Sequence, residues 1–181
     1  MQILLDEQSI ADEVARLGSR LTSRYRDRRL TVLGVLTGSV IFLADLVRQI
    51  RIPHRIGVIQ ASSYRGPTTR PGTLTVNTEL LPEIEGHDVL LVDDIFDTGH
   101  TLDALVKHVQ ALGALSVETA VLLSKQGRSE VDLQPDYLCF RIPDVFVVGY
   151  GLDYDDEFRY LPHVAAMEHE DLRARDEKPS T

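Results

Sequence analysis

The sequence predicts an α/β domain with a mostly parallel central sheet flanked by helices, and three stretches of the chain carry this prediction. Residues 30–36 and 89–92 are largely apolar, and each is followed by a short loop and then by a helical pattern. A third strand-like run, 116–124, comes after the second of these helices. Strands buried on both faces read as near-continuous apolar runs, and strand–helix alternation is typical of parallel sheets.

Length and composition indicate one globular domain and exclude several classes of protein. The chain has 181 residues, 43% of them hydrophobic, which is enough for a sizeable core. Its net charge of −9 argues against nucleic-acid binding, and the arginine-rich stretch 24–29 is expected to face solvent at a helix end. No apolar run reaches the roughly 18 residues of a membrane span, and no secretion signal is evident. We therefore expect a cytoplasmic protein that binds neither nucleic acid nor membrane.

The N-terminal part predicts helix, strand, loop and helix in succession. Residues 9–25 form an amphipathic helix with Ser9 as a plausible N-cap. A buried strand over 30–36 leads through the small loop 37–39 into a second helix that ends near Ile50. Such a loop lets its backbone approach an anion closely, although an ordinary strand-to-helix connection explains it equally well.

A strand over 56–63 is followed by residues 64–72, which are rich in turn formers, and by a short strand over 73–77. The loop 64–72 either connects a hairpin or closes over a reaction centre. Beyond 116–124, we expect short strands at 137–142 and 146–150. Cys139, the only cysteine, falls in a strand and is expected to be an inert thiol.

The most informative stretch is the end of the strand at 89–92. Asp93 and Asp94 follow this strand directly, at the sheet edge where open α/β sheets bind ligands. Residues 97–101 then lead into a helical pattern that Gly113 closes. The free N–H groups of that helix start, beside the hydroxyls of Thr98 and Thr101, would seat a phosphate. A divalent cation such as Mg²⁺ or sugar hydroxyls would then separate the phosphate from the acids. On its own, an Asp-Asp pair that caps the next helix is the plainer explanation.

The whole run 89–101 resembles the phosphoribosyl-pyrophosphate (PRPP) motif of type I phosphoribosyltransferases. Other segments narrow this resemblance to the 6-oxopurine phosphoribosyltransferases. They are Ser62-Ser63-Tyr64, Leu123-Ser124-Lys125, Pro135-Asp136-Tyr137, Ile142-Pro143-Asp144, and the specific block Phe146-Val147-Val148-Gly149-Tyr150-Gly151-Leu152-Asp153-Tyr154.

The resemblance implies a single domain over 1–167 with the type I phosphoribosyltransferase fold and a charged tail over 168–181. A small hood would be formed by the N-terminal segment and about 128–167, and a flexible loop would include Ser63 and Tyr64. The implied reaction transfers 5-phosphoribosyl from PRPP to N9 of hypoxanthine or guanine. Its products are the mononucleotide, IMP or GMP, and pyrophosphate.

The resemblance also implies roles for residues of the PRPP motif. Asp93 and Asp94 would bind the ribose hydroxyls, directly or through Mg²⁺, and Asp97 would act as the general acid/base near purine N7. The 5′-phosphate loop would consist of Asp97, Thr98, Gly99, His100 and Thr101.

Other implied roles concern the purine and the pyrophosphate. Lys125 would donate to the purine 6-oxo group, which disfavours adenine. Phe146 would stack on the base, and Val147 would contact it through its backbone. Asp153 would lie at the purine end of the site as a Mg²⁺ ligand beside the pyrophosphate, and pyrophosphate itself would be held by Thr37, Gly38 and Arg159.

Two positions depart from the family pattern. Thr37 stands where many members carry lysine, so pyrophosphate would rely on backbone N–H groups there. His100 also replaces a frequent lysine, which could make phosphate binding depend on pH near neutrality.

Two further functions remain open from the residues. The first is a regulator of the same fold that binds RNA and senses nucleotides, and the second is an enzyme of the same fold that prefers xanthine or a pyrimidine. The net charge opposes the regulator, and the 146–153 block opposes a pyrimidine. Family members are dimers or tetramers, so we expect a homodimer or homotetramer.

Overall fold

A six-stranded sheet forms the body of the protein in a computed structural model that describes residues 1–63 and 74–168. Its strands lie in the order β4-β3-β2-β5-β6-β7. All neighbouring pairs are parallel except β3 and β4. The strands span Leu30–Leu36 (β2), His54–Ser63 (β3), Leu74–Asn77 (β4), Asp88–Phe96 (β5), Ser116–Lys125 (β6) and Tyr137–Ile142 (β7).

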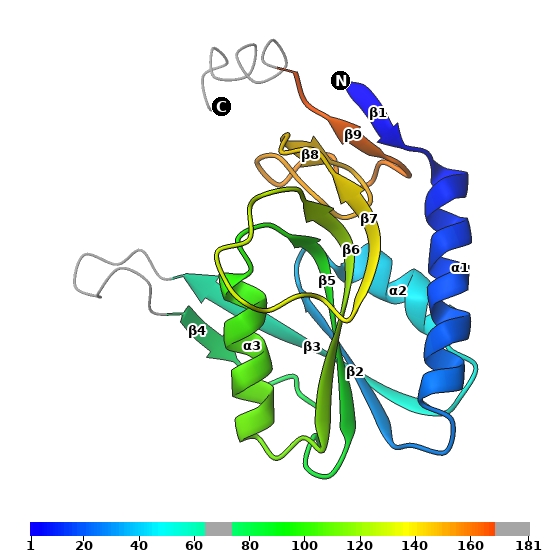
Figure 1. Cartoon of the computed structure of the whole chain (residues 1–181), viewed down its shortest axis with the longest axis vertical. Coiled ribbons are helices and arrows are strands. Elements are labelled where there is room, and N and C mark those ends of the chain that lie inside the picture. Colours follow the sequence, from blue (N-terminus) through cyan, green and yellow to red (C-terminus); the bar gives the residue numbers. More distant parts are fainter. Residues whose placement is uncertain (64–73, 169–181) are drawn as a thin grey trace, which may run out of the picture.

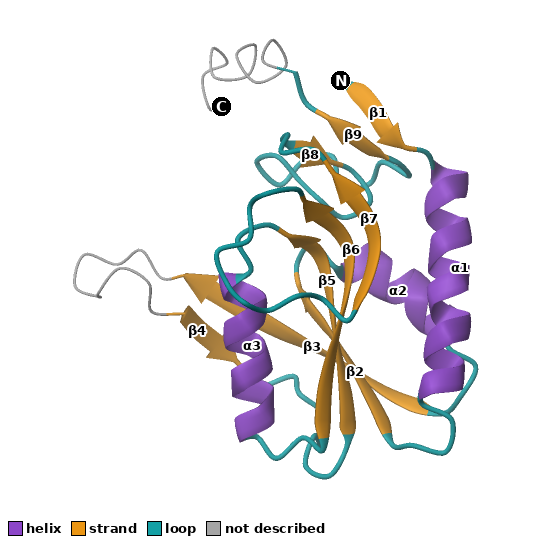
Figure 2. Ribbon diagram, viewed as in Figure 1, coloured by secondary structure: helices purple, strands orange, loops and turns teal. Residues whose placement is uncertain are grey.

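Three helices cover the two faces of this sheet. Helices α1 (Glu7–Arg24) and α2 (Val40–Gln49) lie on one face, and α3 (His100–Ala111) lies on the other (Figures 1 and 2). Side chains of the central strands point alternately to the two faces. In β5, Leu90 and Val92 pack with the α1 and α2 side, while Val89 and Leu91 pack with α3. Burial on both faces explains why this strand reads as a continuous apolar run.

A second, three-stranded sheet stands beyond the carboxyl ends of the main strands (Figure 1). It pairs β1 (Gln2–Leu5) and β8 (Val147–Val148) with β9 (Val164–Ala166), which lies between them. Its strands come from the segments that the resemblance assigns to the hood. Strand β7 does not belong to it, although the hood was expected to start near residue 128, because β7 pairs in parallel with β6.

Several expected elements are confirmed, with shifted ends. The first helix begins at Glu7, and Asp6 rather than Ser9 is its N-cap. The Asp6 carboxylate accepts the Ser9 N–H at 2.7 Å, so Ser9 lies inside the first turn. The hairpin reading of the 64–72 connection is confirmed by the antiparallel pairing of β3 and β4. The loop itself lies outside the described residues, and so does the tail from 169.

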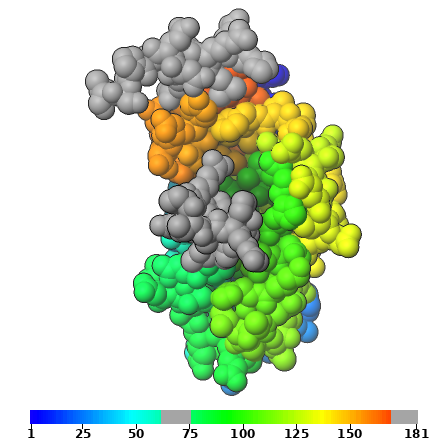
Figure 3. All heavy atoms as spheres, turned by 90° about the vertical axis from the view of Figure 1, so that its left-hand side faces the viewer, coloured from blue at the N-terminus to red at the C-terminus, as the bar shows by residue number. Residues whose placement is uncertain are grey.

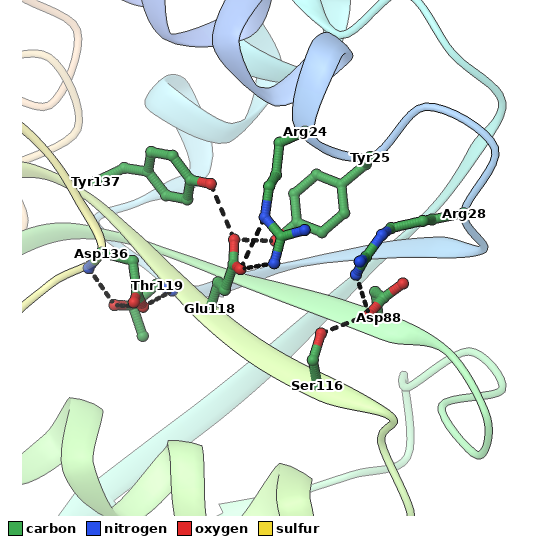
Figure 4. A network of polar contacts seen from close by, with 9 residues as sticks. All are labelled: Arg24, Tyr25, Arg28, Asp88, Ser116, Glu118, Thr119, Asp136 and Tyr137. Atoms are coloured by element: carbon green, nitrogen blue, oxygen red, sulfur yellow. Dashed lines mark hydrogen bonds and ion pairs between the residues drawn. The ribbon is translucent and has the colours of Figure 1, made fainter.

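The arginines of 24–29 were expected to face solvent, but two of them pair with carboxylates of the main sheet. Arg28 pairs with Asp88 at 3.2 Å. The Glu118 carboxylate accepts hydrogen bonds from Arg24, from Tyr25 at 2.8 Å and from Tyr137 at 2.9 Å (Figure 4). This network ties the end of α1 to strands β6 and β7.

Among the described residues, every helix is too short or too polar to cross a bilayer. Cys139 lies in β7, and burial raises the pKa of its thiol to about 12. The thiol is therefore protonated near neutral pH, in line with the inert role expected from the sequence.

Candidate active site

The carboxyl ends of the parallel strands surround a cavity of about 290 Å³. Strands β2 and β5 run side by side in parallel, so the loops that follow them lie at the same edge of the sheet. The cavity is lined by Val35, Leu36, Ala61, Asp93, Asp94, Ile95, Phe96, Asp97, Thr98, Gly99, Thr101 and Leu102. Six of the residues expected to hold PRPP therefore share one hollow. The small sheet stands over this end of the main body (Figure 3).

Asp93 and Asp94 are the last acidic residues of β5, which extends to Phe96 rather than ending at Val92. Asp93 is only 8% exposed and accepts the backbone N–H of Asp94 at 3.0 Å. Burial raises the pKa of both carboxyl groups, and the charge of Asp94 raises the pKa of Asp93 further. Nearby Arg159 acts in the opposite direction on Asp94. The pair is thus a concentration of negative charge with little water around it.

The loop between β2 and α2 approaches this acid pair with its backbone. Its Leu36–Thr37 peptide bond is cis. A Cβ added to Gly38 would overlap the Asp94 carboxylate, so only glycine allows this contact. Thr37 is exposed, and its carbonyl accepts the Val40 N–H at 3.2 Å.

The start of α3 provides free backbone donors at the cavity wall. Gly99 is its N-cap in the left-handed region (φ 87°), and no side chain caps the helix within the described structure. The first intrahelical bond runs from the Asp103 N–H to the Gly99 carbonyl. The N–H groups of the first turn therefore lack helical partners and carry the positive end of the helix dipole. An anion in the cavity would meet them.

Beside the cavity, Asp97 belongs to a cluster of four charged side chains. The Lys125 ammonium lies 3.6 Å from the Asp97 carboxylate and 3.6 Å from that of Asp144. The Arg128 Nε donates to the other oxygen of Asp97 at 2.9 Å. Arg128 was not expected from the sequence. A lysine and an arginine three residues apart are its only signal, and such spacing is common on surfaces.

The small-sheet side supplies the remaining expected charges. Arg159 pairs with Asp153 at 2.8 Å and donates to the Gly151 carbonyl at 2.7 Å. The second Asp153 oxygen accepts the Asp156 N–H at 3.0 Å. In the chain as described, no three potential metal ligands of the His, Cys, Asp or Glu type come together. Asp153 is therefore not grouped with Asp93 and Asp94.

Phe146 and Val147, which were expected to contact the base, do not line this cavity and differ in exposure. The Phe146 ring is 43% exposed and packs edge-on against Tyr154, with 5.5 Å between ring centroids. Val147 is 5% exposed and pairs with Ala166 in the small sheet. An exposed aromatic face braced by a second ring can accept a planar base.

The structure does not bring every expected residue to the cavity. The His100 side chain is 63% exposed and lies 2.9 Å from Glu130 instead. Ser63 is the last residue of β3, and Tyr64 lies outside the described residues.

A larger hollow of about 510 Å³ lies at the opposite end of the main sheet. Its lining includes Asp88, whose carboxylate accepts hydrogen bonds from Arg28 and Ser116 in the same lining. Its central carboxylate is thus already occupied within the fold, so the hollow at the carboxyl end is the better candidate despite its smaller volume.

Known proteins are similar to this chain both in sequence and in fold. The family model of the phosphoribosyl transferase domain matches residues 1–155. A hypoxanthine-guanine phosphoribosyltransferase of Staphylococcus epidermidis is 39% identical over 168 residues, which cover 93% of this chain and 94% of that protein. The hypoxanthine phosphoribosyltransferase of Salmonella typhimurium is 37% identical over 169 residues, covering 92% of this chain and 95% of its own.

Solved structures give the same result. A hypoxanthine phosphoribosyltransferase from Staphylococcus aureus superposes with a TM-score of 0.88 at 36% identity, over 94% of this chain and 92% of its own. The Trypanosoma cruzi hypoxanthine phosphoribosyltransferase gives a TM-score of 0.89 at 34% identity, over 97% and 95%. The fold is the type I phosphoribosyltransferase fold expected from the motif. The chain therefore belongs to the phosphoribosyltransferase family and, within it, to the hypoxanthine-guanine branch.

Proposed function

We propose that this protein transfers 5-phosphoribosyl from PRPP to N9 of hypoxanthine or guanine, giving IMP or GMP and pyrophosphate in purine salvage. The observation that carries the proposal is the shared cavity, in which the acid pair Asp93–Asp94 faces the uncapped start of α3. A sugar phosphate needs both anion donors and hydroxyl acceptors, and this cavity provides the two together. The relatives carry this activity in their names.

The 5′-phosphate would bind at the first turn of α3, where the backbone N–H groups and the helix dipole favour an anion. Thr98 and Thr101, which line the same cavity, supply hydroxyl groups beside them. The Gly99 backbone has φ 87°, and a Cβ there would meet the Phe96 ring at 2.7 Å. Any larger residue would therefore distort this phosphate seat.

The acid pair would accept the ribose hydroxyls and help to hold Mg²⁺. The donor set fits this ion, because Mg²⁺ takes oxygen ligands from one or two carboxylates together with substrate phosphates. The raised pKa of Asp93 and Asp94 fits it too, since a cation would offset two neighbouring buried charges. When bound, Mg²⁺ would neutralise charge on the departing pyrophosphate. Asp153 has less support as a Mg²⁺ ligand than Asp93 and Asp94, because both of its oxygens already have partners.

The base would be oriented by Asp97 and Lys125. On hypoxanthine and guanine, the 6-oxo oxygen and N7 are neighbours on one edge of the ring. A side-by-side cation and carboxylate match this edge, and the Lys125–Asp97 separation of 3.6 Å provides them. The exposed face of Phe146 would stack on the ring.

The chemistry follows from these positions. The bond from C1′ of the ribose to the pyrophosphate oxygen breaks, and its electron pair leaves with pyrophosphate. The N9 lone pair forms the new bond to C1′, and the proton on N7 passes to the Asp97 carboxylate. Donors placed at the phosphates before the reaction stabilise the charge that develops as the bond breaks. Thr37 and Gly38, with Arg159 on the opposite side, would hold the leaving pyrophosphate.

The alternative functions have less support. An RNA-binding regulator needs an open basic face, but Arg24 and Arg28 are paired with carboxylates and the chain carries a net charge of −9. A xanthine-preferring enzyme would need a side chain that recognises the oxo group at purine C2, and none of the contacts described above provides one.

The direct experiment incubates the purified protein with PRPP, MgCl₂ and hypoxanthine, guanine, xanthine or adenine in separate reactions. We expect IMP and GMP to form, with xanthine and adenine far slower. Omitting MgCl₂ or adding EDTA should abolish turnover. If no base gave a mononucleotide, the proposal would be overturned. Faster turnover of xanthine than of hypoxanthine and guanine would show instead that the protein is a xanthine-preferring enzyme.

We also propose a cytoplasmic homodimer or homotetramer. Apolar side chains remain exposed around both sheets, among them Leu115 at 71%, just before β6, and Ile3 at 57%, in β1. Light scattering after size-exclusion chromatography would measure the mass in solution. A mass of about one 20.3 kDa chain would contradict the proposed assembly.

A further inference from the structure

The charged cluster beside the cavity gives the two oxygens of Asp97 different neighbours. The Oδ1 atom accepts the Nε–H of Arg128 at 2.9 Å, whereas Oδ2 lies 3.6 Å from the Lys125 ammonium. Three separate segments meet here, namely the loop after β5, the turn after β6 and the residues after β7. The contact joins residues 31 positions apart in the chain, so it is a product of the fold.

Asp144 completes the cluster by facing both cations. Its Oδ1 lies 3.6 Å from the Lys125 ammonium and 3.8 Å from the Arg128 Nε. Lys125 is thus shared between two carboxylates and is only 13% exposed, while Arg128 is 44% exposed. An ion pair as exposed as Arg128–Asp97 contributes little to stability. What the pair can do is fix the orientation of the Asp97 carboxylate.

We propose that Arg128 is a positioning residue for the phosphoribosyl transfer, which rests on the function proposed above. By holding Oδ1, Arg128 fixes the Asp97 carboxylate so that Oδ2 remains beside Lys125 and free to meet purine N7. The planar guanidinium and its directed N–H groups suit this task better than an ammonium. Arg128 itself does not touch the reacting atoms.

Loss of Arg128 has two consequences in this arrangement. The Asp97 carboxylate can rotate, and Lys125 becomes its nearest remaining cation. The lysine, which already lies 3.6 Å from Asp97, is then drawn closer to this carboxylate and away from the 6-oxo group, so both side chains that recognise the purine edge are displaced together. The start of α3 and the acid pair of β5 are untouched, so PRPP binding should persist.

The first test compares Arg128→Ala with wild type in the transfer of phosphoribosyl to hypoxanthine. We expect kcat to fall by about 10- to 100-fold, the scale on which misplaced catalytic groups act, with the KM for PRPP unchanged. Arg128→Lys, which retains a cation but not the directed N–H groups, should lie between the two.

Arg55→Ala is the matched control. Arg55 is 47% exposed and bonds Glu83 at 2.7 Å, so it resembles Arg128 in exposure and pairing. It stands at the start of β3, at the opposite end of the sheet from the cavity. Its replacement should leave kcat unchanged.

A double-mutant cycle separates positioning from a general structural effect. If Arg128 acts through Asp97, the double variant Arg128→Ala/Asp97→Asn should lose no more kcat than Asp97→Asn alone. Independent, multiplying losses would overturn the proposal, and so would a wild-type kcat in Arg128→Ala. Thermal unfolding checks that each variant folds. If Arg128→Ala does not fold, Arg128→Gln, which keeps a donor of shorter reach, takes its place in the cycle.

Wild-type turnover is measured first. If the wild-type protein forms no mononucleotide, both the proposed function and the role of Arg128 are overturned. If the wild type is active and Arg128→Ala is equally active, only the role of Arg128 is overturned.

Discussion

At the scale of single residues, the site depends on close approaches of the backbone that only glycine permits. Gly38 brings the loop after β2 against the Asp94 carboxylate, where a Cβ cannot fit. Gly151 makes a similar approach, because its own Cβ would overlap the Gly38 carbonyl. Gly151 therefore packs against the loop after β2, and Gly38 of that loop packs against the acid pair. Each of the two contacts needs a glycine.

We predict that Gly38→Ala displaces the Asp94 carboxylate and weakens PRPP binding by about tenfold or more, equivalent to at least roughly 1.4 kcal/mol. Isothermal titration with PRPP and Mg²⁺ would measure the change. Gly86→Ala serves as control, because an added Cβ there meets nothing within 4 Å. It carries backbone strain at φ 71°, so it should reduce stability without changing PRPP affinity. Equal affinity in Gly38→Ala would show that the acid pair tolerates movement.

Thr37→Lys should strengthen the binding of pyrophosphate and PRPP. Thr37 is exposed beside Gly38, and a cation there could add a charge-assisted hydrogen bond to a phosphate oxygen. We expect about a tenfold gain in affinity, or roughly 1.4 kcal/mol. The gain should shrink at high ionic strength, as expected for an exposed charge. The KM for hypoxanthine is the internal control. Unchanged affinity for both phosphates would mean that the backbone N–H groups already suffice.

At the scale of elements, the polar network around Glu118 joins the end of α1 to the paired strands β6 and β7, a link that strand pairing does not make (Figure 4). Glu118 is carried by β6 and accepts from α1 and from β7. Burial alone would raise the pKa of Glu118, but the hydrogen bonds from Arg24, Tyr25 and Tyr137 outweigh it and lower the pKa below its usual value. The ionised carboxylate is therefore the form that the fold stabilises.

We predict that Glu118→Gln lowers the free energy of unfolding at pH 7 by about 1.5–3 kcal/mol, the range for hydrogen bonds to a charged group. A group with a lowered folded-state pKa contributes its stability above the unfolded-state value, here 4.5, and loses it as pH falls through the folded-state pKa. The difference between variant and wild type should thus decline below about pH 4.5. Urea unfolding at several pH values would measure it. The exposed Glu79, replaced by Gln, should show no such difference, and a pH-independent loss for Glu118→Gln would contradict the linkage.

At the scale of the whole molecule, the site reduces the stability of the fold that holds it. The main sheet buries Asp93, whose pKa is raised by burial and by the neighbouring charge of Asp94. A carboxyl group with a raised folded-state pKa binds its proton more tightly in the folded protein, so the stability falls as pH rises from the unfolded-state value towards the folded-state one. The fold thus loses stability at the cavity that is proposed to bind substrate and Mg²⁺.

Asp93→Asn should therefore melt at a higher temperature than wild type without ligand, and the difference should grow as pH rises above 3.8, the ordinary pKa of an aspartate. For a domain of this size, each kcal/mol corresponds to roughly 2–4 °C in Tm. PRPP with Mg²⁺ should raise the Tm of wild type more than that of the variant, because binding stabilises only the state that binds. Differential scanning calorimetry measures both effects. Asp12→Asn, at an exposed position of α1, is the control, and an equal rise there would refute the explanation.

Much of the fold follows from local patterns along the sequence. The central strands are predictable because burial on both faces requires continuous apolar residues, as in Val89–Leu91. The helices are predictable from their apolar faces. By contrast, β1 and β9 are too short to carry a pattern of their own, and they form only because Gln2 meets Ala166 across almost the whole chain. The true N-cap, Asp6, was missed because Asp and Ser are equally good caps in sequence.

The sequence by itself determined the succession of the main-sheet strands and the helices along the chain and the acidic, hydroxyl-rich loop after β5, because these depend on neighbours within one strand or one helical turn. The tertiary structure alone decided which side chains meet. Arg128 bonds Asp97, Arg24 bonds Glu118, and His100 turns to Glu130 rather than into the cavity. Such contacts join residues brought together by sheet order and loop path, and no local pattern records them.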